Sequence, residues 1–404
     1  VPTLSVIVLI HNIYLLGQPN LMLLALLLGA FACLRRGREV AAGALVATAA
    51  AIKAFPILVL GYLVYRRMWR ASLATVAVLA AWLLIAPLPF RAPAQAVDDL
   101  SVWTRGMLFT YDKHGIAQRP LRSYSYKNQS IMAVMHRLLR DVPADGEAVL
   151  SGRSHGAPGV VRPTKGLAPP DPSTDLLSFL KPHRRGDAAT DGDAGIAGPT
   201  ARWEDDIQRA EPALRAAWKV NFLNLDFPTV TAITLAAMMG LCLFVAAVMP
   251  PRQDRTGATD ALEFALVTLL TLIFSPLSFN YAYVWLLYPT TLALHRLLNE
   301  PGDPPARWRA VKVVWIAAVL LIPALAIPMP QAAQACGNLF VPAVLLVFGL
   351  GAMLRLEQGP VVRSQGSVVS RYRADGRPRP IVSSRTTALA GPVGPVDPRT
   401  TDHC

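Results

Sequence analysis

An apolar stretch of 26 residues, 40–65, constrains the fold most, because Lys53 is its only charged residue. Pro56 interrupts the stretch three residues after the lysine. Short basic loops stay on the cytoplasmic side of a membrane, so two such loops require an even number of crossings between them. We therefore expect residues 40–65 to form a hairpin that enters the membrane and returns. The flanking basic residues are Arg35, Arg36, Arg38, Arg66, Arg67 and Arg70.

The hairpin would place Lys53 at the outer surface of the membrane. A single straight helix would be about 39 Å long against a hydrocarbon core of about 30 Å, and it would hold the lysine at mid-depth. Two arms of about 18 Å each are too short to span alone, so they need neighbouring helices or a thinned bilayer. An ionisable residue in this position suggests a functional site. The alternative is an ordinary lysine at a helix end whose ammonium reaches the interface.

The composition is that of a polytopic membrane protein. Hydrophobic residues make up 53% of the chain and charged residues 16%, and the apolar residues form long blocks. The net charge of +13 does not indicate nucleic-acid binding, because the arginines lie in short loops and in the C-terminal tail. No zinc-ligand cluster, phosphate-binding glycine loop or serine nucleophile elbow is present, so we expect no metal and no cofactor. The four cysteines are scattered and predict no disulfide.

The arginine loops predict an all-α protein with about ten membrane crossings. The chain starts with Val1 directly in apolar sequence, so we expect a fragment that lacks its N-terminus. The block 261–298 is too long for one crossing, and Pro276 near its middle forces a break. The predicted apolar segments are residues 3–16, 20–34, the two arms of 40–65, 71–87, 228–249, two helices within 261–298, 311–328 and 338–354.

These segments divide the chain into six regions. Ser130 is a suitable N-cap for a short amphipathic helix over 131–139, which we expect to lie on the membrane surface. The regions are N-terminal membrane helices over 1–90, an outer loop with the amphipathic helix over 91–142, a disordered low-complexity insert over 143–200, a returning outer loop over 201–227, C-terminal membrane helices over 228–356, and a disordered basic cytoplasmic tail over 357–404.

The predicted crossings bring several polar positions to the same outer surface. Such positions at helix ends suit an amphiphilic substrate whose lipid tail stays in the bilayer. Each also has an ordinary explanation: the triplet 128–130 is a glycosylation sequon or a helix cap, and aromatic residues near Ser275-Pro276 are common at interfaces. The candidate site residues are Gln18, Asn20, Lys53, Asn128, Gln129, Ser130, Ser275, Ser278, Asn280 and Tyr281.

The order and spacing of these motifs closely resemble glycosyltransferase family 87. The resemblance covers residues 1–140 and 228–330 and implies a GT-C membrane fold. It also implies an integral plasma (inner) membrane enzyme with an extracytoplasmic active face. Such an enzyme moves a hexose, mannose-like, from a polyprenyl-phosphate donor to a lipid-linked or glycan acceptor. The motifs are Gly17-Gln18-Pro19-Asn20-Leu21, Ala42-Gly43, Ala51-Ile52-Lys53-Ala54-Phe55-Pro56, Asn128-Gln129-Ser130, Arg137-Leu138-Leu139 and Ser275-Pro276-Leu277-Ser278-Phe279.

The resemblance implies that Lys53 binds the donor phosphate. Transfer also needs a carboxylate to take the acceptor proton. In GT-C enzymes that acid lies in the first outer loop, which we expect upstream of residue 1. The nearest outer carboxylates present are Asp98, Asp99 and Asp112.

Two features leave other functions open. Family members often carry an acidic residue and histidines where Asn280, Tyr281 and Ala282 stand here, which also fits a divergent acceptor or an inactive member. A transporter or flippase of a lipid-linked molecule would use broken helices and an isolated lysine too, although no inverted repeat is visible. A non-catalytic membrane scaffold is the third alternative.

Overall fold

The computed structural model describes residues 10–11, 13, 17–104, 111–116, 121–146, 149, 199–298, 312, 315–321 and 330–357. Most of the expected segments 3–16 and 311–328 therefore lie outside the described residues, as do nearly all of the insert expected over 143–200 and the tail expected over 357–404.

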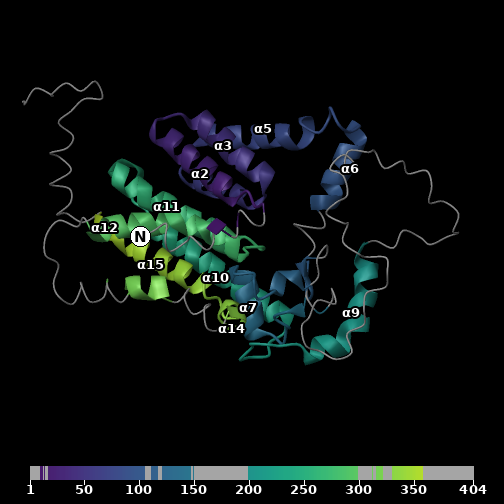
Figure 1. The fold of residues 1–404 in the computed structure, drawn as a ribbon. Helices are drawn as coiled ribbons and strands as arrows, with labels where there is room; N and C mark the ends of the chain where they lie inside the picture. Colours follow the sequence, from purple (N-terminus) through teal and green to yellow (C-terminus); the bar gives the residue numbers. More distant parts are fainter. Residues whose placement is uncertain are drawn as a thin grey trace, which may run out of the picture. The chain divides into compact units, whose positions relative to one another are not determined.

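The described part of the N-terminal half is helical, with one very short hairpin of strands (Figure 1). The strands β1 (Tyr111–Asp112) and β2 (Gly115–Ile116) pair antiparallel, with Tyr111 opposite Ile116. The helices are α2 (Asn20–Arg35), α3 (Glu39–Ile52), the 3-10 turn η1 (Phe55–Ile57), α4 (Leu58–Tyr65), α5 (Trp69–Ala80), the π-helical turn η2 (Ala81–Ile85), α6 (Pro93–Thr104), η4 (Arg122–Tyr124) and α7 (Ile131–Leu139).

The described part of the C-terminal half is also helical. Its helices are α9 (Pro199–Ala216), α10 (Phe227–Val248), η6 (Arg252–Asp254), α11 (Gly257–Phe274), η7 (Asn280–Leu286), α12 (Leu287–Leu298), α14 (Pro330–Ala335) and α15 (Phe340–Glu357). The predicted break in the block 261–298 is present, since α11 ends one residue before Ser275-Pro276.

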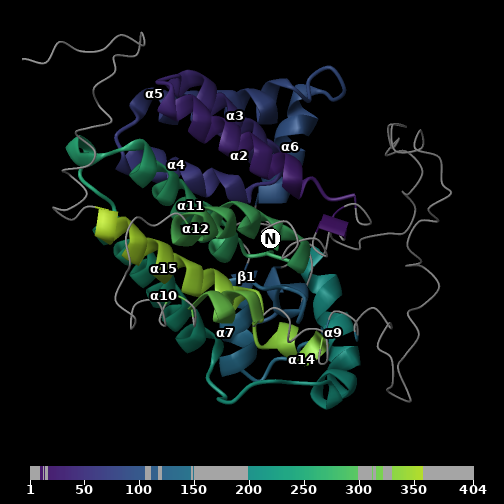
Figure 2. The same cartoon turned by 60° about the vertical axis from the view of Figure 1, so that its left-hand side comes forward.

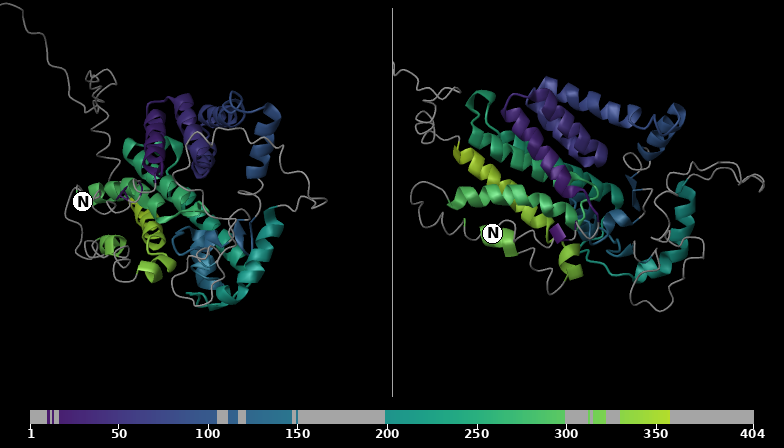
Figure 3. Two further views of the ribbon diagram at one scale, coloured as in Figure 1. Left: turned by 45° about the vertical axis from the view of Figure 1, so that its right-hand side comes forward. Right: turned by 45° about the horizontal axis from the view of Figure 1, so that its top comes forward.

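Three of these helices, α10, α11 and α15, are long and apolar enough to cross a membrane, and four shorter apolar helices occupy 20–35, 39–52, 55–65 and 69–85. The prediction of an integral, helical membrane protein is therefore confirmed. Figures 1 and 2 show α11 between the α2 to α5 helices on one side and α10 and α15 on the other. In the right panel of Figure 3, purple α2 and yellow α15 run in the same general direction.

The chain reverses around Lys53, as the arginine loops predict. The loops before and after the stretch 40–65 both lie beside the N-terminal part of α11. A Cβ atom added at Gly257 would lie 2.7 Å from a guanidinium nitrogen of Arg35, and Arg66 pairs with Glu263. At the other end, Lys53 contacts the first residue of α2. Residues 40–65 thus leave one end of α11 and come back to it.

The helix α7 begins as predicted, and most of its residues are buried within the protein. Ser130 caps it, because its Oγ accepts a hydrogen bond from the Ala133 N–H at 3.1 Å. Other parts of the protein cover this helix: His136 and Arg137 are fully buried, and α7 packs against α10. Burial, together with the nearby Arg140 charge, lowers the pKa of His136 to about 3, so the imidazole is neutral and tolerates the interior.

Gly43 lets α3 and α5 approach closely. A Cβ atom at Gly43 would lie 2.3 Å from the Ala71 carbonyl oxygen and 2.8 Å from the Ala74 Cβ. The Thr75 hydroxyl donates a hydrogen bond to the Gly43 carbonyl at 3.2 Å. Small residues that permit such approach are a general device of helix association in membranes.

We expect Gly43→Val to separate α3 from α5 and to destabilise the protein by about 1–3 kcal/mol through overpacking. Gly61 in α4 is the matched control, because a Cβ there would meet nothing within 4 Å. Thermal unfolding of both valine variants in detergent tests the expectation. Equal melting temperatures for the two variants would contradict it.

Candidate functional site

Lys53 lies in the turn between α3 and η1, surrounded by one amide and two aromatic rings. Its Nζ donates a hydrogen bond to Asn20 Oδ1 at 3.3 Å. The same nitrogen lies 5.2 Å from the ring centroid of Phe55 and 5.4 Å from that of Tyr281. Among the described residues no carboxylate forms an ion pair with it. The ammonium is therefore a fixed cation whose counter-ion can be a ligand.

Trp285 of η7 holds these elements together. It is fully buried, and its indole N–H donates a hydrogen bond to the Asn20 carbonyl at 2.9 Å. Its ring packs against Phe55, with 4.8 Å between the ring centroids. The start of α2, the turn after α3 and the 3-10 segment after α11 thus meet at Lys53, although they lie far apart in the sequence.

Burial lowers the pKa of Lys53 to about 8. The surroundings remove water from the ammonium, and no neighbouring carboxylate offsets this loss. The group that can titrate beside it is the phenol of Tyr281; the other two contacts, Asn20 and Phe55, do not titrate. Lys53 is mostly charged at neutral pH, and a small rise in pH discharges it.

Two buried side-chain atoms near this site have no hydrogen-bond partner among the described residues. One is Nδ2 of Asn20, a donor, and the other is Oδ1 of Asn280, an acceptor that comes directly before Tyr281 in the chain. A buried polar atom without a partner costs about 1–3 kcal/mol. A ligand that carries both an acceptor and a hydroxyl donor would satisfy the two atoms.

Asn128 and Ser130 were candidate substrate contacts, but the protein itself uses their hydrogen-bonding groups. Asn128 Nδ2 donates to the carbonyls of Ser123 and Pro276 at 2.8 Å each, and its Oδ1 accepts from the Ser278 N–H at 3.0 Å. Both residues are fully buried. In the folded protein Asn128 thus joins the loop before α7 to the turn after α11, and its buried side chain is not accessible for glycosylation.

Gln129 acts in the same way toward the C-terminal helices. Its Nε2 donates to the carbonyls of Tyr126 and Gln334 at 2.9 and 2.6 Å, and its Oε1 accepts from the Leu339 N–H at 3.5 Å. Ser278 is similarly engaged, since its hydroxyl donates to the Leu272 carbonyl at 2.5 Å. These residues position the loops around the site.

Arg137 is a positioning residue whose role the sequence does not reveal. Its guanidinium is fully buried and donates to backbone carbonyls, at 3.0 Å to Ala335, 2.7 Å to Ser125 and 2.8 Å to Asn128. Carbonyl oxygens here replace the water that an arginine on an amphipathic helix would otherwise need. Arg137 therefore ties α7 and the loop 121–130 to α14.

In the described part of the chain, none of the remaining candidates forms a hydrogen bond or ion pair with Lys53. Gln18 is half-buried, and its backbone N–H donates to the Ile13 carbonyl at 3.0 Å. Ser275 is the buried residue that ends α11. Asp98 and Asp99 are exposed on α6, where Asp99 pairs with Arg91. Asp112 lies in β1, opposite Gly115.

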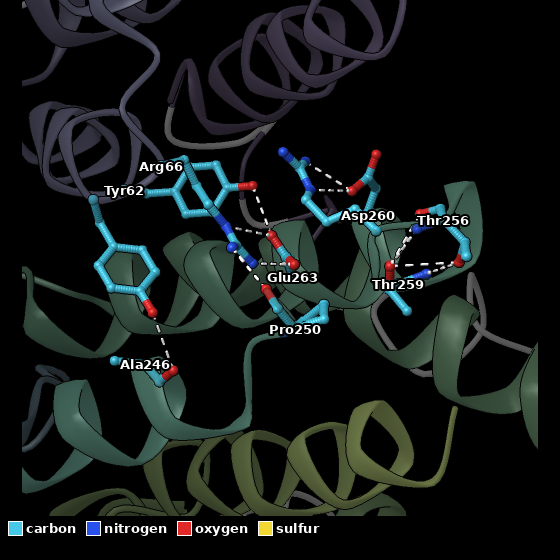
Figure 4. A network of polar contacts seen from close by, with 10 residues as sticks. Tyr62, Arg66, Ala246, Pro250, Thr256, Thr259, Asp260 and Glu263 are labelled. Carbon is cyan, nitrogen blue, oxygen red and sulfur yellow. Dashed lines mark hydrogen bonds and ion pairs between the residues drawn. The ribbon is translucent and has the colours of Figure 1, made fainter. Parts of the chain in front are cut away.

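A second polar cluster lies beside α11 and was not predicted from the sequence (Figure 4). Glu263 is fully buried and accepts hydrogen bonds from the Arg66 guanidinium, through Nε at 3.1 Å, and from the Tyr62 hydroxyl at 3.0 Å. Arg66 also donates to the Pro250 carbonyl at 2.9 Å. The available signal was that Glu263 is the only acidic residue in the block 261–298.

The described residues contain no group of three His, Cys, Asp or Glu side chains that could hold a metal ion. No curated protein and no solved structure matches the chain significantly. A match to a protein-family model covers α2 to α7 and includes Asn20, Lys53 and Phe55. Residues 4–154 match the model of Glycosyltransferase family 87, and the chain therefore contains a domain of this membrane glycosyltransferase family.

Proposed function

We propose that this protein transfers a hexose, mannose-like, from a polyprenyl-phosphate donor to a hydroxyl of a lipid-linked or glycan acceptor. The reaction takes place at the outer face of the plasma (inner) membrane, on a GT-C bundle of about ten crossings. The family 87 domain over residues 4–154 supports transferase activity. The observation that carries the donor assignment is Lys53, a partly buried cation held by Asn20 and two aromatic rings without a carboxylate partner in the described residues.

Lys53 would act on the leaving group. In the transfer, the bond between the sugar C1 and the phosphate oxygen breaks, and the lipid phosphate leaves with the electron pair. The acceptor oxygen forms the new bond to C1 and gives its proton to a base. A fixed ammonium stabilises the charge that develops on the departing phosphate, and such a contact works best where water is excluded. Neither Asp98 nor Asp99 contacts Lys53, so neither gains support as the base.

The groups beyond Lys53 suit a sugar. Tyr281, whose ring faces the ammonium, stacks on Phe279 with 5.8 Å between the centroids. Flat aromatic faces offer apolar contact to the C–H groups of a sugar ring. The unpartnered Oδ1 of Asn280 can accept a hydrogen bond from a sugar hydroxyl.

The proposal is tested by incubating membranes that contain the full-length protein with polyprenyl-phosphate sugar labelled in the sugar. We expect label in a lipid-linked or glycan product, above the level in membranes without the protein. Movement of intact donor across the membrane without transfer would identify a flippase. An unchanged donor on both faces would favour the scaffold.

Activity should fall as the pH rises through about 8, because Lys53 loses its proton there. The charged form is complete below this pKa, so the rate at low donor concentration should be level on the acid side and drop about tenfold per pH unit above it. Lys53→Arg should remove this drop, since a guanidinium stays protonated. A wild-type profile that is flat between pH 7 and 10 would contradict the assignment.

A further inference from the structure

The side-chain amide of Asn20 hydrogen-bonds through its oxygen, whereas its nitrogen has no partner among the described residues. Asn20 is the first residue of α2 and is fully buried. The Lys53 ammonium can only donate, so the amide atom that faces it at 3.3 Å must be the oxygen. The nitrogen Nδ2 on the same carbon has no partner and is therefore held beside the ammonium with its N–H groups unused.

The N-terminus of α2 adds further donors at the same place. Gly17, with φ of +58°, turns the chain, and Pro19 precedes a helix of 16 residues. No side chain caps this end. The first N–H groups of a helix lack intrahelical acceptors and carry the positive end of the helix dipole, which favours anions.

The geometry points to a single anion site, and we propose that Asn20 Nδ2, the N-terminus of α2 and the Lys53 ammonium together bind the ester phosphate of a polyprenyl phosphate. The inference rests on the proposed function and adds Asn20 as a second phosphate ligand. Every group in the set is a donor, the ammonium carries a full positive charge and the helix N-terminus a partial one, and phosphate oxygens are acceptors.

A hydrogen bond holds the Asn20 side of the site in place, and Lys53 on the other side is partly exposed. The Trp285 indole fixes the Asn20 carbonyl at 2.9 Å, so the start of α2 cannot shift easily. Lys53 is half-buried, so part of its side chain remains accessible to a ligand. A phosphate that binds the ammonium would accept a hydrogen bond from Asn20 Nδ2 and satisfy this buried donor.

The test is saturation binding of radiolabelled undecaprenyl phosphate to the purified full-length protein in detergent. We expect Asn20→Asp to weaken binding at least tenfold, because a carboxylate would occupy Lys53 and repel the phosphate. The same variant should unfold at an unchanged or higher temperature, since Asp at a helix N-terminus next to a lysine is favourable. Asn221→Asp, the same change in the loop before α10, is the matched control and should bind as the wild type does. Asn20→Ala removes the N–H without adding charge and should also weaken binding, which keeps the test valid if Asn20→Asp does not fold.

Competition separates the ligand sources. Unlabelled undecaprenyl phosphate should displace the probe, whereas undecaprenol and inorganic phosphate should do so at least tenfold less well. Equal competition by undecaprenol would show recognition of the tail alone, and equal competition by inorganic phosphate would show a site for the free ion; either result overturns the proposal. Wild-type affinity in both Asn20 variants would also overturn the proposal. A water molecule would then satisfy the buried Asn20 nitrogen in place of the phosphate.

Phosphate binding and sugar transfer are measured separately, so the Asn20 site and the proposed function can fail independently. Binding that depends on Asn20 in a protein that transfers no sugar would leave the phosphate site standing and remove the transferase. Full sugar transfer by both Asn20 variants would leave the transferase standing and remove Asn20 as a ligand.

Discussion

Glu263→Ala is expected to destabilise the protein by about 3–5 kcal/mol, because it leaves the buried Arg66 guanidinium without its counter-ion. The Tyr62 hydroxyl loses its acceptor in the same step. The pair joins the end of α4 to the interior of α11, so the loss should loosen the contact between the hairpin and the central helix. Unfolding in mixed micelles, followed by tryptophan fluorescence, measures the change.

An exposed ion pair provides the control. Glu211 and Arg215 are joined at 2.6 Å on the outside of α9, and Glu211→Ala should change stability by less than about 1 kcal/mol. The double variant Arg66→Met with Glu263→Leu should recover much of the loss, since no charge is then left unpaired. If Glu263→Ala and Glu211→Ala had the same effect, the pair beside α11 would not be buried as described.

Lys53→Met is expected to reduce sugar transfer by about 10²-fold or more while the protein still inserts and folds. Methionine keeps the apolar stem between Phe55 and Tyr281 but removes the charge that would stabilise the leaving phosphate. Lys53→Arg should keep part of the activity, although its planar guanidinium has a different geometry. Transfer of labelled sugar at equal expression level is the measurement.

Lys127 is the matched control for this substitution. It also lies over an aromatic ring, 5.6 Å from the centroid of Tyr126, but it is exposed and away from Asn20. Lys127→Met should leave transfer within about twofold of the wild type. Wild-type rates in Lys53→Met would show that the lysine is only an interfacial anchor. The transporter and scaffold hypotheses would then be as well supported as the transferase.

Local signals predicted the helical class and several turns of the chain. The arginine loops and Pro56 predicted that the chain turns at Lys53, and Pro276 predicted the break after α11. Ser130 was recognised as a cap because its hydrogen bond spans three residues. The signals at Pro276 and Ser130 lie within one loop or one turn of helix, and the turn at Lys53 follows from the basic residues on either side of it, so the sequence contains the necessary information.

The arrangement of the candidate site could not be predicted from the sequence, because it depends on contacts between segments that lie far apart in the chain. Trp285 binds Asn20 across 265 positions, and no periodicity links the two residues. Arg137 lies in the predicted amphipathic helix, and nothing local predicts that the backbone carbonyls of Ser125 and of the distant Ala335 bind its guanidinium. The triplet 128–130 suggested substrate contacts for the same reason: its polar groups could only be assigned once the turn at Ser278 was known to face them.

The central claim is that the donor phosphate binds at Lys53, and photo-crosslinking tests it most directly. The probe is a polyprenyl phosphate with a diazirine beside the phosphate, and mass spectrometry identifies the labelled peptides of the full-length protein. We expect label in residues 17–24, 52–56 and 279–285, and we expect this label to disappear when unlabelled polyprenyl phosphate is added. Saturable label confined to the outward face of α10, where Leu235, Met239 and Leu243 are exposed, would contradict it.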